Sequence, residues 1–203
     1  MWPWGHAAVG YLLYGLLSTG RTPEEGAPGA PAGPAVLALG VGTQFPDLVD
    51  KPLSWSLALL PSGRTLAHSA LVGAVVIAAL LAVAARRRTD GAGTDRDRRV
   101  PGDRPGPVPS RPVATAFSLG YVSHLLADVP PSVLAGQVAD AGYLLWPVVP
   151  AAVYAGEESW GAHLPPEVTA FFLVQALVTL VAVGVWLRDG APGLDVLASA
   201  VGR

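Results

Sequence analysis

Two long apolar runs, residues 66–85 and 168–187, restrict the fold of this chain more than any other feature. His68 is the one ionisable residue in the first run, and the second run contains none. An α-helix needs about 20 consecutive apolar residues to cross the hydrocarbon core of a bilayer, where every backbone polar group must be paired within the protein. Arg86 and Arg188 follow the two runs. We therefore predict that both runs form transmembrane helices.

Three shorter apolar runs, residues 4–17, 34–45 and 113–129, extend this pattern. The first two fall short of the roughly 20 residues of a full span, so we expect them to be tilted or partly covered by neighbouring helices. Residues 143–154 are also apolar, but their length and proline content favour a re-entrant or interfacial segment. The sequence thus predicts an all-α, polytopic helical membrane protein with about four transmembrane helices and one such short segment.

The composition agrees with a membrane location and restricts the available chemistry. Hydrophobic residues make up 51% and charged residues 14% of the 203 residues, whereas soluble domains carry about 25% charged residues. This length fits a single domain, which we place at residues 1–203. The sequence contains no cysteine, so disulfides and thiolate ligands are excluded. Any metal ion must therefore be held by His, Asp, Glu or backbone oxygen.

Residues 86–112 form a polar segment between apolar runs. The segment contains eight Arg and four Asp among many Gly and Pro residues, and this composition predicts a disordered linker. Arginines in loops accumulate on the cytoplasmic side of a membrane, so we expect the linker in the cytoplasm. Because Asp residues are interspersed, contact with anionic membrane lipid is a better interpretation than a nucleic-acid-binding arm, and no nucleic-acid partner is predicted.

The alternating directions of four spans place six polar side chains at the same end of the helix bundle. Each of them lies where an apolar run begins or ends on that side. The six are His6, Asp47, Asp50, His68, His124 and Asp128. Since the Arg-rich linker is placed in the cytoplasm, their end of the bundle is expected to be the extracytoplasmic one.

His124 and Asp128 are four residues apart within one of the apolar runs. On a helix this spacing places both side chains on one face. Burying an imidazole and a carboxylate in a membrane protein is costly unless they are paired or functional. The two residues either bind a metal ion or form a structural hydrogen-bonded pair that joins helices.

Three further polar residues, Asp47, Asp50 and Arg64, also have two interpretations each. Asp47 follows Pro46 and is either a metal ligand or a turn residue. Asp50 precedes Lys51 and is either a ligand or half of a surface ion pair. Arg64 either orients a phosphate or carboxylate of a substrate or lies among the lipid headgroups. As a set, mixed nitrogen and oxygen ligands suit zinc, manganese or iron better than calcium.

The sequence resembles the YdjM-like family of inner-membrane-associated metal-dependent hydrolases. Five pieces in a fixed order carry the resemblance, and the fourth of them is the most specific. They are Gly5-His6, Pro46-Asp47-Leu48-Val49-Asp50, Arg64 followed by His68-Ser69, Gly120-Tyr121-Val122-Ser123-His124-Leu125-Leu126-Ala127-Asp128, and Leu145-Trp146-Pro147. In two places the chain departs from the family pattern, with Gly63 where many members carry His and with Asp50 one position later than the usual second acid. These departures leave open whether one or two metal ions bind.

The resemblance implies a multi-span helical membrane protein with a metal site. From the mixed nitrogen and oxygen ligands we expect a divalent ion, zinc in the first place and manganese or iron as alternatives. We expect the metal ligands to be His6, His68, His124 and Asp128, with Asp47 next. Asp50 is expected to be a further ligand or the general base. Arg64 is expected to stabilise a developing negative charge.

Two functional hypotheses remain at this point. The first is a multi-pass, membrane-bound metal-dependent hydrolase, which acts on a lipid or phosphoester because its site lies at headgroup depth and a metal-bound water is nucleophilic near neutral pH. The second is a non-catalytic metal carrier or structural module, in which the polar group joins the helices. A carrier needs ionisable residues along a path across the membrane, whereas residues 69–85 and 168–187 contain none.

Overall fold

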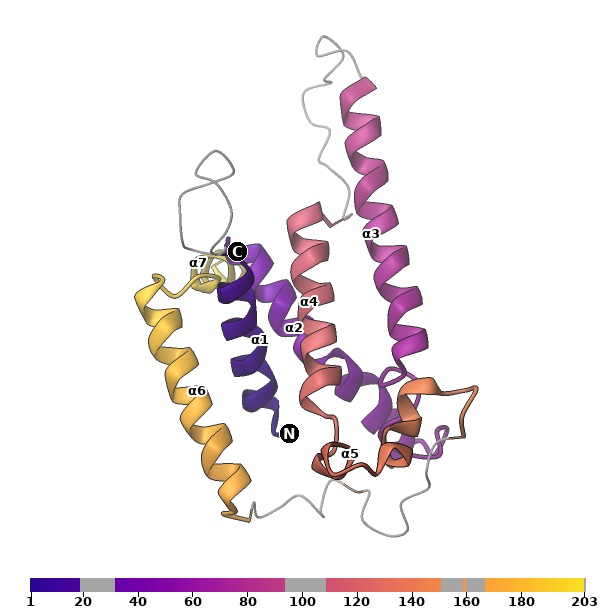
Figure 1. Cartoon of the computed structure of the whole chain (residues 1–203). Coiled ribbons are helices and arrows are strands. Elements are labelled where there is room, and N and C mark those ends of the chain that lie inside the picture. The colour runs from indigo at the N-terminus through magenta and orange to yellow at the C-terminus, as the bar shows by residue number, and fades with distance from the viewer. Residues whose placement is uncertain (19–31, 94–108, 151–158, 160–166, 203) are drawn as a thin grey trace.

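The computed structural model describes residues 1–18, 32–93, 109–150, 159 and 167–202, and in these parts the chain is helical with no strand (Figure 1). Most of the predicted linker, residues 94–108, lies outside the described residues. The same holds for residues 151–154 of the predicted re-entrant segment. In the described part of that segment, residues 143–150, a short 3-10 helix ends at Leu145 and a turn follows.

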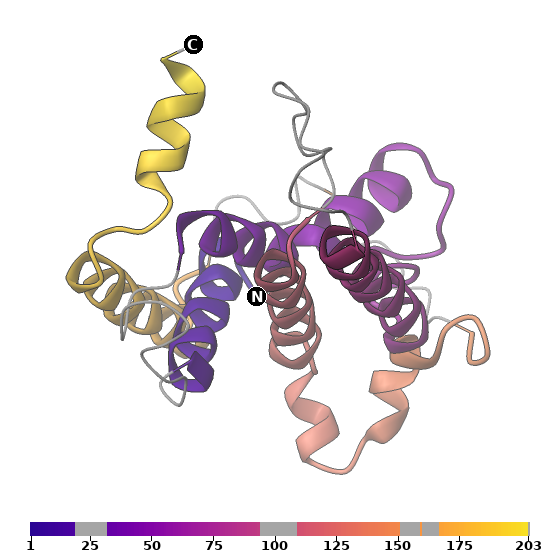
Figure 2. The ribbon, with the colours of Figure 1, turned by 90° about the horizontal axis from the view of Figure 1, so that it is seen from above.

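Seven α-helices, one π-helical turn and one 3-10 helix make up the described fold. The long helices α1, α3, α4 and α6 lie side by side, and α2 crosses behind α1 and α4 (Figure 1). Helix α7 extends away from the bundle (Figure 2). The helices are α1 (Pro3–Ser18), α2 (Gly33–Lys51), the π-helical turn η2 (Pro52–Ser56), α3 (Ala70–Gly93), α4 (Arg111–Ala127), α5 (Pro131–Leu134), the 3-10 helix η4 (Val138–Leu145), α6 (Ala170–Arg188) and α7 (Leu194–Val201).

Helix α6 has the properties of a membrane span. It contains 19 residues, reaches a mean hydropathy of 2.3 and buries few of its side chains within the protein. Among the described residues it is the one helix that is long and apolar enough to cross a bilayer. The helical fold is therefore confirmed, whereas four transmembrane helices are not. The predicted span 66–85 is shorter in the structure, because α3 begins only at Ala70. The apolar part of α3 is Ala70–Arg86.

Two predicted boundaries are wrong because helices continue past them. Helix α2 passes through Pro46 and ends at Lys51, although a proline within a helix removes one backbone hydrogen bond. Packing around the proline favours continuation, since the ring of Phe45 lies 5.5 Å from that of Phe117 and 5.7 Å from that of Tyr121 in α4. Helix α3 likewise continues to Gly93, into the predicted linker, where Ala and Arg are good helix formers.

The contact between α2 and α4 is the most extensive between helices and depends on two glycines. A Cβ atom at Gly120 would overlap the backbone carbonyl of Leu39, and one at Gly42 would overlap the backbone carbonyl of Phe117. The two backbones can therefore approach closely only because neither position carries a side chain. This close approach brings the second half of α2 next to the end of α4 that carries His124.

We expect Gly120→Ala to lower the free energy of unfolding by about 1–3 kcal/mol, because an added methyl group would push α4 away from α2. Gly40→Ala is the matched control on α2, since a Cβ there has no atom within 4 Å and alanine favours a helix. Thermal unfolding of detergent-solubilised protein measures both. Equal melting temperatures for the two variants would contradict this account of the interface.

Candidate metal centre

Two imidazole nitrogens face each other at the centre of the polar group. His68 lies between η2 and α3, and His124 lies in α4. The Nδ1 atom of His68 donates to Asp50 Oδ2 at 2.8 Å, and Nδ1 of His124 donates to the carbonyl of Thr43 at 2.7 Å. Neutral imidazoles with these partners keep their lone pairs on Nε2, and the two Nε2 atoms are 3.1 Å apart. Two facing lone pairs repel each other unless a positive charge lies between them.

Two carboxylates complete a four-membered group around these nitrogens. Asp47 Oδ1 lies 3.5 Å from Nε2 of His68 and 3.9 Å from Nε2 of His124. Asp128 Oδ2 lies 3.6 Å and 3.9 Å from the same two atoms. All four ligand atoms fall within 4.8 Å of one another. Ligands of a tetrahedral zinc ion at 2.0–2.1 Å are about 3.3 Å apart, so the group has nearly the dimensions of such a site.

The four residues are shielded from solvent, and one of their atoms lacks a hydrogen-bond partner. His68 and His124 are fully buried, and Asp47 and Asp128 are 8% and 6% exposed. Within the described parts of the chain, the buried Oδ1 of Asp47 has no hydrogen-bond partner, which is costly for a carboxylate oxygen. A cation at this position would satisfy both this oxygen and the two facing imidazoles.

The carboxylates favour a positive charge at His68, which lies outside the helices. Burial lowers the pKa of His68, but the neighbouring carboxylates of Asp128, Asp47 and Asp50 outweigh burial and raise the pKa to about 10. A proton or a metal ion can supply the charge that this environment favours. Because the two compete for the same nitrogen, metal binding at this group releases protons.

Asp50 holds the backbone that carries His68. Its Oδ1 accepts the N–H of Ala67 at 2.8 Å, and its Oδ2 accepts the N–H groups of Thr65 at 2.8 Å and His68 at 3.1 Å. These N–H groups are therefore bound to a side chain, and α3 begins only at Ala70. Asp50 is fully buried, and it pairs with His68, so the alternative of a surface pair with Lys51 is wrong.

Three cations contact the carboxylates of Asp47 and Asp128. Lys51 Nζ lies 2.6 Å from Asp47 Oδ2. Arg64 Nε lies 3.3 Å from Asp128 Oδ2, and the Met1 ammonium lies 2.7 Å from Asp128 Oδ1. These three positive charges lie around the group of four and compensate the negative charge of the two carboxylates.

His6 lies next to the four-membered group rather than within it. Its ring stacks on that of His124, with centroids 3.9 Å apart, and its Nε2 lies 3.2 Å from Asp128 Oδ1. The contact with Asp128 does not have the geometry of a hydrogen bond, and neither ring nitrogen of His6 has such a partner among the described residues. The structure thus brings all the predicted residues together, with His6, Asp50 and Arg64 around the four atoms.

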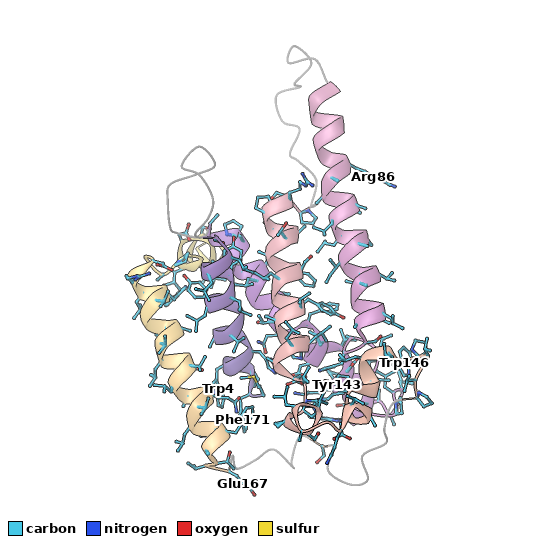
Figure 3. All side chains as sticks on the ribbon, in the orientation of Figure 1. Trp4, Arg86, Tyr143, Trp146, Glu167 and Phe171 are labelled. Carbon is cyan, nitrogen blue, oxygen red and sulfur yellow. The ribbon has the colours of Figure 1, made fainter. Side chains whose placement is uncertain are left out.

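Two tyrosines that sequence reasoning did not select also support the site. Tyr121 donates to the carbonyl of Ala67 and ties α4 to the backbone around His68. Tyr143 of η4 donates to the carbonyl of Asp128 at 3.1 Å and lies at the end of the molecule opposite Arg86 (Figure 3). The spacing of Tyr121 from His124, three residues on one helix, was the available signal for the first of them.

The chain matches one known protein family. The family model described as YdjM inner membrane protein matches residues 1–200. No curated protein matches the chain. No solved structure matches it. The match confirms the resemblance seen in the sequence.

Asp50→Asn is expected to weaken divalent-metal binding by about 10–100-fold, the usual effect of losing a residue that orients a metal-binding histidine. The side-chain nitrogen of asparagine is a donor, so it cannot accept the N–H groups that one of the two Asp50 oxygens accepts. His68 therefore loses its orientation. Titration of zinc into folded, detergent-solubilised protein measures the change, with Asp140→Asn as control, because Asp140 is an exposed residue near the start of η4. An unchanged affinity in Asp50→Asn would mean that Asp50 does not position His68 for binding.

Proposed function

The chain belongs to the YdjM family of inner membrane proteins, and we propose that it is a metal-dependent hydrolase. The observation that carries this proposal is the buried Oδ1 of Asp47, which has no hydrogen-bond partner among the described residues and lies next to two facing Nε2 atoms. Asp47, His68, His124 and Asp128 would hold the ion, and zinc, manganese or iron fits two nitrogen and two oxygen ligands. When bound, such an ion supplies Lewis acidity and a water nucleophile near neutral pH.

The residues around the four ligands have separate roles in this proposal. Asp50 positions His68 and does not act as general base, because both of its oxygens are engaged by backbone N–H groups. His6 would accept the proton of the attacking water, since it is buried beside Asp128 and its ring nitrogens have no hydrogen-bond partner among the described residues. Arg64, whose side chain is 35% exposed, binds the negative charge that develops on the substrate.

The arrangement of the ends of the bundle supports an extracytoplasmic site. Tyr143, which contacts the site, lies at one end of α3, and Arg86 lies far along the same helix (Figure 3). By the positive-inside rule the arginines that begin at Arg86 lie in the cytoplasm, so the site faces the other side. We propose that the protein is multi-pass, with α1, α2, α3 and α4 in the membrane alongside α6. The site then lies at the depth of the lipid headgroups.

A non-catalytic structural module is the alternative. The observation in its favour is that Lys51, Arg64 and the Met1 ammonium already contact the carboxylates. With a proton on His68, the contacts of His68, Arg64 and the Met1 ammonium with Asp47 and Asp128 would join the ends of the helices without an ion. Metal content separates this alternative from the proposed enzyme.

We expect purified wild-type protein to contain close to one zinc, manganese or iron ion per chain, and His68→Ala and His124→Ala to contain none. Each histidine supplies one of four ligands, and the loss of one ligand greatly lowers affinity. Elemental analysis of folded protein measures the content, with Asp195→Asn in α7 as a control away from the site. A metal-free wild type after reconstitution would support the structural module.

His6→Ala is expected to keep the metal ion and to lose activity by about 10²–10⁴-fold, the contribution of general acid–base catalysis. The reason is that the four ligand atoms form their group without His6. Metal content and hydrolysis of chromogenic carboxylic and phosphoric esters are measured on the same sample. Loss of the ion together with activity would instead make His6 a ligand.

A further inference from the structure

We propose that the substrate carries an anionic phosphoryl group, which Arg64 and Lys51 bind at the entrance of the site. This inference rests on the proposed hydrolase function and narrows it to one substrate class. Lys51 is the new residue in this account. It is the single lysine of the chain and lies one turn beyond Asp47 on α2.

The exposed side of the site is cationic. The Arg64 side chain is 35% exposed and the Lys51 side chain is 21% exposed. The side chains of His68 and His124 are 0% exposed, and those of Asp47 and Asp128 are 9% and 4% exposed. A molecule that approaches the four ligands therefore meets two positive charges first, with the acidic groups behind them.

The charges of the site also favour an anion once the ion is bound. With both histidines neutral, Asp47, Asp50 and Asp128 carry three negative charges, and Lys51, Arg64 and the Met1 ammonium carry three positive ones. One divalent ion then makes the site net positive. A net positive charge in a poorly hydrated site is costly without a counter-charge. A phosphate ester supplies that counter-charge, whereas a neutral carboxylic ester does not.

Both cations are held in place by a carboxylate of the site and carry several donor groups. Lys51 Nζ lies 2.6 Å from Asp47 Oδ2 and 5.4 Å from the ring centroid of Trp55, and an ammonium group has three donors. Arg64 contacts Asp128 Oδ2, one of the four ligand atoms, through Nε. A guanidinium group has a planar set of five donors that suits phosphate. A phosphoryl oxygen on Arg64 therefore lies next to the ligand group.

Two sources of the phosphoryl group are tested with separate probes on metal-loaded protein in dodecyl maltoside, a detergent without phosphate. Phenylphosphonate represents a soluble phosphoester, and dioleoyl phosphatidic acid represents a lipid. Dioleoylglycerol, with the same acyl chains and no phosphate, is the neutral control. Binding is measured by titration, and the metal content of each sample is determined first.

We expect at least one anionic probe to bind the wild type, and dioleoylglycerol not to bind. Arg64→Gln and Lys51→Gln should each weaken binding about tenfold or more, as expected for a lost charged hydrogen bond, when they are compared with the wild type at equal metal occupancy. Arg64→Lys should recover part of the affinity. Arg188→Gln is the control, because Arg188 is 79% exposed at the far end of α6. Binding of phenylphosphonate indicates a soluble source, and binding of phosphatidic acid alone indicates a lipid source.

Two results would overturn the inference while leaving the hydrolase proposal in place. One is a metal-loaded protein that binds neither anion but cleaves a chromogenic carboxylic ester. The other is equal affinity for phosphatidic acid and dioleoylglycerol, unaffected by Arg64→Gln or Lys51→Gln. A wild type that takes up no metal ion would instead reject the hydrolase proposal, and this inference with it.

Discussion

The buried carboxylate of Asp50 is the interaction on which the rest of the site depends. It accepts three backbone N–H groups from residues 65–68 and the Nδ1–H of His68. Because this carboxylate fixes both the backbone and the ring, Nε2 of His68 can only point toward Nε2 of His124. A neutral side chain at Asp50 would leave buried donors without partners, which is costly in a protein interior.

Helix packing and site geometry are coupled through the contact between α2 and α4. The Nδ1–H of His124 reaches the carbonyl of Thr43 at 2.7 Å, which is possible only where the two backbones nearly touch at Gly42 and Gly120. The same contact places Asp47 opposite His124. The interface between α2 and α4 thus stabilises the bundle and also sets the spacing of three of the four candidate ligand atoms, those of Asp47, His124 and Asp128.

The sequence predicted which residues come together at the site better than it predicted which of them pair with each other. Alternating helix directions place His6, His68 and His124 at one end, and the structure brings them together. The pairing of Lys51 with Asp47 rather than Asp50 depends on the rotation of α2, which is set by its continuation through Pro46. The hydrogen bonds of Asp50 to a non-helical backbone are long-range contacts, and periodicity carries no information about such contacts.

The central claim is that two histidines and two aspartates bind one metal ion. X-ray absorption at the metal edge of the purified protein tests this most directly, because outer-shell scattering from imidazole rings reports histidine ligands. The account predicts a first shell of nitrogen and oxygen near 2.0–2.1 Å for zinc, with scattering from two imidazoles in the wild type. An oxygen-only shell without imidazole scattering would contradict it.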